Sequence, residues 1–297
     1  MNRRSAIKTA SAGAAAAVLG SIASTQSVSA STSAVQQTDA PLKGYVKHSV
    51  SYWCFNKYPL DEFAKICKEI GIQSIELLDP KDWPVVQKHG LTCAMAQGAG
   101  MGIDNGWNNP ELHDRLVASY EEVIPQVAKA GLTNLICFSG RRRGLTDEQG
   151  WANCEHGLKR IIKIAEQHKV VLIMELLNSI SHRDYQCDRT AWGVELCKRI
   201  GSENFKLLYD IYHMQIMEGN IIENMTKNIQ YIAHIHTGGN PGRNEIDETQ
   251  ELNYPAIMKA LVKTGYKGFV GQEFVPKAAD PIASLRRCIH ICDVAPS

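Results

Sequence analysis

Four acidic or histidine residues each close a short apolar run, in an order that suits a metal site. The four are Glu175, Asp210, His236 and Glu273, which follow the runs 171–174, 205–209, 232–235 and 269–272. Side chains at the C-terminal ends of parallel strands converge on one mouth when the strands close into a barrel. Three carboxylates and one imidazole suit Mn²⁺, Mg²⁺ or Co²⁺, with Zn²⁺ as an alternative. One such carboxylate would be a solvated strand end, whereas four in register predict a divalent-metal site.

A divalent ion between two glutamates predicts a particular chemistry. A 2-hydroxy carbonyl compound can chelate the ion through both oxygens, and the ion then stabilises the enediolate as a Lewis acid. Glu175 and Glu273, on different walls of the mouth, are the candidate catalytic residues that remove and return the proton. Return to the neighbouring carbon gives aldose–ketose isomerisation, and return to the opposite face gives epimerisation.

The elements that must position these residues alternate between strand and helix from Gly44 to the end of the chain. Strands are expected at 45–53, 72–78, 91–97, 132–138, 170–176, 205–210, 231–236 and 268–274. Helices are expected at 59–70, 83–89, 110–130, 146–168, 189–200, 221–228, 254–264 and 281–291. The strands are continuous apolar runs, typical of a parallel sheet buried on both faces. Residues 44–297 therefore predict one α/β domain, a single (β/α)8 TIM barrel. A doubly wound sheet is the alternative, although no glycine-rich phosphate turn follows the first strand.

Composition limits the classes of partner. The 297 residues are 44% hydrophobic and carry a formal charge of +1, enough for a large core but without a basic excess. Nucleic-acid-binding proteins usually show a basic face, so no nucleic-acid partner is expected. The expected partner is a small molecule, a hydroxy-keto acid or a sugar, and a homo-oligomer is left open. The nine cysteines include no CxxC pair, and most fall in apolar segments, so buried free thiols are expected.

The N-terminus has the pattern of an export signal. Arg3 and Arg4 precede a short Ala- and Gly-rich apolar run over residues 10–22, and small residues at 28–30 suit cleavage. Residues 1–30 therefore predict a twin-arginine signal peptide, followed by a polar linker at 31–43. A membrane-spanning anchor is the alternative, but the run is short for that role. The expected mature protein is soluble, periplasmic and without a stable membrane anchor.

Several motifs of the C-terminal half resemble the hydroxypyruvate isomerases, within the xylose isomerase-like group of TIM barrels. They are YDIYHMQIMEGN from Tyr209, NPGRNE from Asn240, ELNY from Glu251, and GYKG from Gly265 with Glu273 after it. The resemblance implies that Glu175, Asp210, His236 and Glu273 bind the metal and that the two glutamates move protons. It also implies that His213 and Arg243 contact the substrate.

The sequence departs from that family in two places. Hydroxypyruvate isomerases tend to carry Gln where this chain has His236, whereas the related epimerases carry His. After Glu245 the usual continuation is Pro-x-Thr-Gly-Glu, and here residues 246–251 are IDETQE. These departures keep a ketose 3-epimerase or a keto-sugar lyase open as alternatives. A non-catalytic periplasmic barrel that binds sugar is a further alternative, and a DNA-repair nuclease is disfavoured by the acidic balance that remains once residues 1–30 are removed.

Other residues are weaker candidates for contact with substrate. Glu76 closes the second expected strand, and a structural ion pair is as good an interpretation of it. Asn178 and His182 follow Glu175 closely and either line the site or belong to a loop. His234 precedes His236 by two residues, so both side chains should point the same way, with His234 one layer deeper. Tryptophans could wall a sugar-sized pocket, although core packing is their default; the candidates are Trp53, Trp83 and Trp107.

Overall fold

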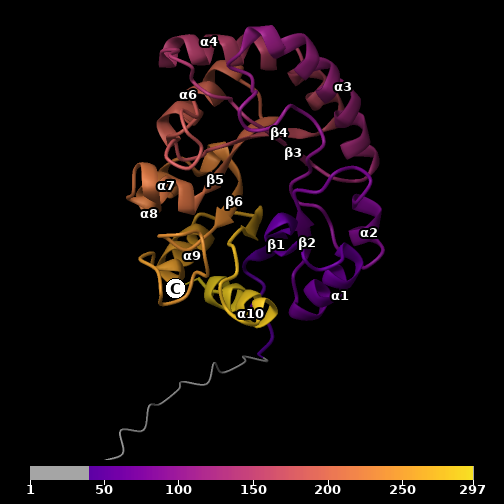
Figure 1. Cartoon of the computed structure of the whole chain (residues 1–297), viewed down its shortest axis with the longest axis vertical. Helices are drawn as coiled ribbons and strands as arrows, with labels where there is room; N and C mark the ends of the chain where they lie inside the picture. The colour runs from indigo at the N-terminus through magenta and orange to yellow at the C-terminus, as the bar shows by residue number, and fades with distance from the viewer. Residues whose placement is uncertain (1–39, 297) are drawn as a thin grey trace, which may run out of the picture. The chain divides into compact units, whose positions relative to one another are not determined.

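A computed structural model of the chain describes residues 40–296. The predicted signal peptide lies outside these residues, as does most of the predicted linker. The described part is built around one parallel sheet of seven strands in the order β2-β1-β7-β6-β5-β4-β3. The strands are β1 (Lys47–Ser51), β2 (Ser74–Glu76), β3 (Asn134–Cys137), β4 (Val171–Glu175), β5 (Phe205–Asp210), β6 (Ile232–Thr237) and β7 (Phe269–Gln272). The sheet curls on itself, with the helices around its outside (Figure 1).

The segment expected as the third strand closes the curled sheet without forming a regular strand. Residues 91–97 carry only isolated bridges, from Thr92 to Ser74 and from Ala96 to both Leu78 and Leu135. Side chains replace ladder hydrogen bonds here: the Ser74 hydroxyl accepts from the Ala94 N–H, and the Asn134 amide donates to the Ala94 carbonyl. The third of the eight expected strands is thus an irregular connection, and the fold is the expected TIM barrel.

Helices cover the outer face of the sheet. They are α1 (Leu60–Ile70), α2 (Trp83–Gln87), α3 (His113–Lys129), α4 (Asp147–Leu158), α5 (Ile162–His168), α6 (Thr190–Ile200), α7 (Ile211–Met217), α8 (Ile221–Lys227), α9 (Tyr254–Lys263) and α10 (Pro281–Cys292). Glycines in the left-handed conformation end α1 and α6, at Gly71 and Gly201, so both helices end at the residues expected from the sequence. The expected single helix at 146–168 is divided into α4 and α5, and α7 was not expected at all.

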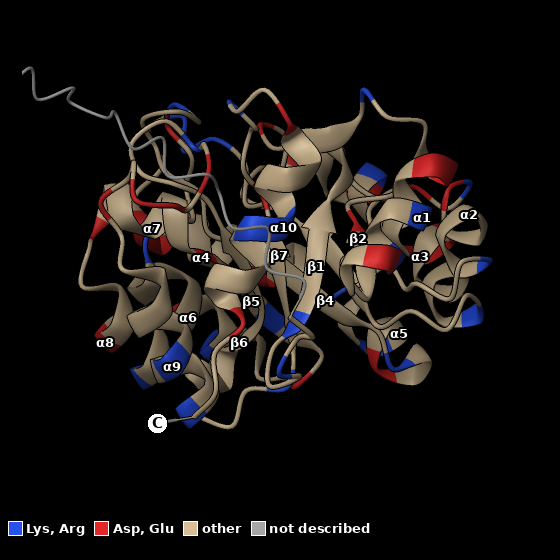
Figure 2. Cartoon of the chain, turned by 90° about the horizontal axis from the view of Figure 1, so that it is seen from below, with Lys and Arg blue, Asp and Glu red and all other residues tan. Residues whose placement is uncertain are grey.

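The barrel interior has one apolar and one polar part. Met95, Ile136, Ile173 and Leu208 form a small buried apolar cluster, separate from the large core between sheet and helices. Buried polar side chains gather instead on β1, β2 and β6, namely Ser49, Ser51, Ser74, Glu76, His234 and His236. Basic and acidic positions are interspersed over the barrel (Figure 2). Among the described residues, no helix is both long and apolar enough to span a membrane.

Candidate metal and active site

The four strand-end residues meet at one buried centre. Glu175 ends β4, Asp210 ends β5, His236 lies near the end of β6, and Glu273 directly follows β7. Each is at most 5% exposed, and one potential ligand atom from each lies within 4.8 Å of those of the other three. Adjacent strands hold these positions in register, since Asp210 pairs with His236 and His236 with Gly271.

His236 links the centre to a second buried group behind it. Its Nδ1 lies 2.7 Å from Glu273 Oε2 and 3.7 Å from Glu175 Oε1. On the opposite edge of the ring, Nε2 lies 2.7 Å from Glu76 Oε1. One nitrogen of His236 therefore faces the carboxylates of the centre, and the other faces Glu76.

Asp210 has two tasks at once. Its Oδ1 caps α7, accepting hydrogen bonds from the N–H groups of Tyr212 at 2.9 Å and His213 at 3.3 Å. Its Oδ2 turns into the centre, 2.7 Å from Arg243 Nη2. Asp210 therefore both ends a strand and caps the helix at residues 211–217, a helix that was not expected from the sequence.

Arg243 reaches the centre from the loop after β6. Its Nη2 donates to Asp210 Oδ2 and to Glu273 Oε2, and its Nη1 lies 2.9 Å from His213 Nε2. The guanidinium also lies over the rings of Tyr212 and Trp53, at 5.2 and 5.6 Å from their centroids. Arg243 itself has a φ of 56°, in the left-handed region, so the loop holds it in a conformation that few non-glycine residues adopt.

Burial and neighbouring charges push the pKa values of the carboxyl groups apart. Burial raises the pKa of Glu175, and it raises the pKa of Asp210 to about 7 despite the nearby Arg243. Burial acts in the same direction on Glu273, but His236 and Arg243 outweigh it and hold the pKa of Glu273 well below its usual range. The pKa of His236 is raised well above its usual range, because Glu273 and Glu76 outweigh its burial.

The donor set fits a divalent cation. Three carboxylates crowd one buried centre, where like charges repel strongly unless cations compensate them. Arg243 supplies one fixed positive charge, so an added divalent ion would find a surplus of negative charge. Oxygen donors with a single imidazole match hard or borderline ions such as Mn²⁺, Mg²⁺, Co²⁺ or Zn²⁺.

A cavity of about 900 Å³ opens onto the centre. Glu175, Glu273 and Arg243 lie at its wall, together with His182 and Arg141. Apolar side chains form much of the remaining lining, including Trp53, Met101, Ile103, Phe138 and Leu177. The cavity therefore combines a charged end with an apolar wall, as expected for a site that binds a small organic molecule.

The other residues predicted to contact substrate divide into two groups. His182 and Arg243 line the cavity. His213 and Asn178 are fully buried, with Asn178 Nδ2 2.5 Å from His213 Nδ1, so they support the wall from behind. Glu76 is also fully buried, and it faces His234 and His236 rather than the cavity.

Trp53 is a site residue whose contact the sequence did not reveal. It lies in the single 3-10 turn after β1 (Tyr52–Phe55), is 42% exposed, and donates from Nε1 to Glu273 Oε1 at 2.6 Å. Of the three tryptophans considered for the pocket wall, Trp83 and Trp107 belong to the core. The only available signal was the place of Trp53 at the end of the first expected strand, at the same end of the barrel as Glu273.

Comparisons with known proteins agree with this geometry. Residues 55–289 match the family described as xylose isomerase-like TIM barrel. Hydroxypyruvate isomerase of Escherichia coli (strain K12) is 27% identical over 235 residues, which are 75% of this chain and 90% of that protein. The 2-oxo-tetronate isomerase of Cupriavidus necator is 36% identical over 109 residues, or 37% of this chain and 42% of that protein.

A solved structure shows the same fold. The apo form of 3-keto-D-glucoside 4-epimerase from E. coli superposes with a TM-score of 0.69 at 20% identity, covering 82% of this chain and 98% of that one. The family match spans most of the described residues, and named isomerases are among the relatives. The chain therefore belongs to the xylose isomerase-like TIM barrel family and is an isomerase-type enzyme of that family.

Proposed function

We propose that the enzyme is a metal-dependent aldose–ketose isomerase that acts on a small 2-hydroxy carbonyl compound, with hydroxypyruvate as the first substrate to test. The observation that carries the proposal is the pairing of Glu175 and Glu273 at one buried centre with Asp210 and His236, at the wall of a cavity. The named relatives include a hydroxypyruvate isomerase and a 2-oxo-tetronate isomerase, which supports a short hydroxy-keto acid.

The four residues would hold the ion through oxygens of the three carboxyl groups and a nitrogen of His236. Once bound, the ion would act as a Lewis acid that makes the carbon-bound proton of the substrate more acidic. The opposite pKa shifts of the two glutamates suit an acid and a base. Glu273, with its low pKa, would take the proton from one carbon, and Glu175, with its raised pKa, would give its own proton to the neighbouring carbon. The hydroxyl proton of the substrate would move to the former carbonyl oxygen, and exchange with solvent would restore both glutamates.

Cationic and polar groups at the cavity wall would orient the substrate. Arg243 lies at the wall, and its guanidinium lies over the rings of Trp53 and Tyr212. The guanidinium already contacts Glu273, His213 and Asp210, so a substrate carboxylate would bind through the remaining N–H of Nη1 in a charge-assisted hydrogen bond. A substrate carboxylate at this position would place the adjacent hydroxy carbonyl group near the centre, with His182 on the same wall.

A second candidate function, a ketose 3-epimerase or a keto-sugar lyase, is favoured by the size of the cavity. About 900 Å³ is much more than a three-carbon acid fills, and the apolar wall of Trp53, Met101 and Phe138 suits the face of a sugar ring. Both functions begin with the same proton abstraction, and they differ in where the proton returns or which bond then breaks.

Deuterium exchange tests the shared step and separates the products. Protein reconstituted with Mn²⁺ is incubated in deuterated water with hydroxypyruvate, with 2-oxo-tetronate and with a panel of ketoses, and the products are identified by NMR. For the isomerase we expect deuterium in a short acid and formation of its aldehyde isomer. Exchange only into ketoses would support the epimerase, whereas no exchange into any substrate with metal bound would contradict both functions.

A further inference from the structure

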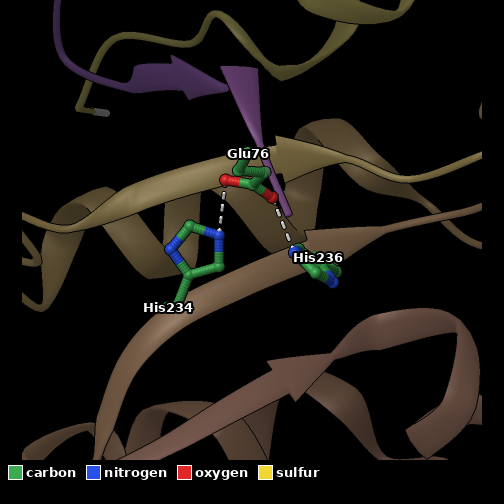
Figure 3. A group of neighbouring side chains, drawn as sticks. All are labelled: Glu76, His234 and His236. Atoms are coloured by element: carbon green, nitrogen blue, oxygen red, sulfur yellow. Dashed lines mark hydrogen bonds and ion pairs between the residues drawn. The ribbon is translucent and has the colours of Figure 1, made fainter. Parts of the chain in front are cut away.

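Glu76 lies at the centre of a buried group behind the metal site. Its Oε1 is 2.7 Å from His236 Nε2, and its Oε2 is 2.9 Å from His234 Nε2 (Figure 3). The two histidines are two residues apart on β6, and their rings are nearly perpendicular, with centroids 5.1 Å apart. One carboxylate from β2 therefore contacts both imidazoles of β6 from the opposite side of the barrel interior.

The surroundings leave Glu76 no route to the substrate. Glu76, His234 and His236 are all 0% exposed, and neither Glu76 nor His234 lines the cavity. Ser51 donates from Oγ to Glu76 Oε1 at 3.4 Å. Gly271 lies beside His236 on the next strand, and its missing side chain leaves space for Glu76 and His236. A Cβ at this position would collide with Glu76 Oε1 and lie 2.9 Å from His236 Cδ2.

A histidine that binds a metal ion must be neutral, with its proton on one nitrogen and a lone pair on the other. The ionised carboxylate of Glu76 accepts hydrogen bonds and cannot donate them. Its contact with Nε2 of His236 is therefore favourable when Nε2 carries the proton. The lone pair of His236 then lies on Nδ1, the atom 2.7 Å from Glu273 Oε2 and 3.7 Å from Glu175 Oε1. The other tautomer would place an acceptor against Glu76 and a hydrogen where a cation must bind.

We propose that Glu76 is a positioning residue that holds His236 with its proton on Nε2, so that Nδ1 is the atom that binds the metal. A carboxylate on the far nitrogen of a metal-binding histidine fixes the ring's tautomer and orientation and increases its basicity. This inference rests on the metal site of the proposed function. It adds a residue that contacts neither the metal nor the substrate.

The test compares metal binding by two variants of Glu76 and by a control variant. Glu76→Leu removes both acceptors at similar size, and Glu76→Gln keeps one acceptor without the charge. Ser49→Ala is the matched control, because Ser49 is a buried polar residue of the same barrel interior whose hydroxyl donates to the Ser74 carbonyl instead. Mn²⁺ dissociation constants are measured by calorimetry, and circular dichroism confirms that each variant is folded.

We expect Glu76→Leu to weaken Mn²⁺ binding by about 10- to 100-fold, the usual effect of losing such a partner. Glu76→Gln should lose less, and Ser49→Ala should bind as the wild type does. A folded Glu76→Leu protein with wild-type affinity would overturn the inference and leave the proposed function standing. A wild-type protein that binds no metal would instead contradict the metal site itself.

A second measurement does not depend on the folding of a variant. In the wild-type protein loaded with diamagnetic Zn²⁺, long-range ¹H–¹⁵N NMR identifies which nitrogen of His236 carries the proton. We expect the proton on Nε2 and the metal on Nδ1. A proton on Nδ1 would overturn the inference even if Zn²⁺ binds at the four predicted residues.

Discussion

Glu175 and Glu273 occupy one buried centre, but their surroundings push their pKa values in opposite directions. Burial dominates at Glu175, whereas His236, Arg243 and a hydrogen bond from Trp53 keep Glu273 ionised. We expect Glu175→Gln and Glu273→Gln each to lower turnover by at least about 100-fold, because each removes a group that transfers a proton. Steady-state kinetics on metal-loaded protein measures this loss.

Deuterium exchange distinguishes the two roles. Glu175→Gln should still exchange the substrate proton with solvent, while Glu273→Gln should not, since Glu273 is the proposed base. Metal content must be near that of the wild type in both variants. Glu203→Gln, at an exposed surface glutamate that pairs with Lys206, is the matched control and should keep full turnover. Normal turnover in both site variants would remove the acid–base assignment and favour a barrel that only binds its ligand.

Metal binding should depend on pH, because the site residues must lose protons to become ligands. The pKa of Asp210 is raised to about 7 by burial, and the pKa of His236 is raised by Glu273 and Glu76. A divalent ion needs Asp210 ionised and His236 neutral, so binding releases protons and weakens as the pH falls. We expect Mn²⁺ affinity to drop by at least about 10-fold between about pH 8 and about pH 6.

Calorimetry in two buffers of different ionisation enthalpy measures the protons released in this titration. An affinity that is constant over the range, with no proton release, would contradict the involvement of Asp210 and His236. A divalent ion bound only by groups that are already ionised would give that result.

At this scale the sequence reveals ligands better than it reveals their partners. Glu175 and Asp210 are visible because a charged residue ends an apolar run. Glu76 has the same local pattern, yet its contacts are with His236, 160 residues further along the chain. Local sequence does not show that two residues so far apart along the chain are in contact. Trp53 was a candidate for the pocket wall, but the sequence could not single it out from Trp83 and Trp107, because core packing is the default for any aromatic residue near a strand.

At the scale of elements, helix ends and buried strands were predictable because their signals are local. The irregular segment 91–97 was not, because side chains of Ser74 and Asn134 take the hydrogen bonds of Ala94 that a strand neighbour would otherwise make. The helix α7 was missed because Asp210 both ends a strand and caps a helix. In each case a polar side chain determines the local backbone conformation, and only the folded structure shows which backbone group that side chain contacts.

The strand β7 must carry glycine opposite His236. In Gly271→Ala the new Cβ would collide with Glu76 Oε1 and approach His236 Cδ2 to 2.9 Å, where a buried carboxylate and imidazole have little room to move. We expect a loss of about 1–3 kcal/mol in unfolding free energy from overpacking. Mn²⁺ affinity should fall as well, because the displaced groups orient a metal ligand.

Gly193→Ala is the matched control for this prediction. Its Cβ would meet the flexible ends of Leu176 and Leu207 at 2.9 Å, in the apolar core under α6. It should change thermal stability without changing metal affinity. Chemical denaturation and calorimetry on both variants decide the question, and equal metal affinities in the two would mean that the space at Gly271 serves packing alone.

For the whole molecule, the barrel interior explains why the site forms where it does. An apolar cluster of Met95, Ile136, Ile173 and Leu208 fills part of the interior. Polar side chains on β1, β2 and β6 occupy another part, where Glu76 and His234 support His236. The apolar part packs the interior of the barrel, and the polar part places the buried carboxylate of Glu76 behind His236, one of the four predicted metal ligands.

The state of the cysteines bears on how such a protein could leave the cytoplasm. All nine are free, and eight of them are buried, as the sequence predicted. Burial raises the pKa of these thiols, to about 12 at Cys197 and Cys292, which makes them poor nucleophiles. A barrel with buried thiols is best folded under reducing conditions, before it meets an oxidising compartment.

That order of events matches the export route predicted for residues 1–30, since the twin-arginine pathway carries folded proteins. We expect Arg3→Lys with Arg4→Lys to retain the protein in the cytoplasm, because the signal depends on the arginine pair rather than on charge alone. Lys8→Arg keeps the pair and should be exported normally. Cell fractionation with marker enzymes for each compartment measures the distribution. If the double variant reached the periplasm at the normal level, export would have to use another route, one that delivers an unfolded chain with nine thiols to an oxidising compartment.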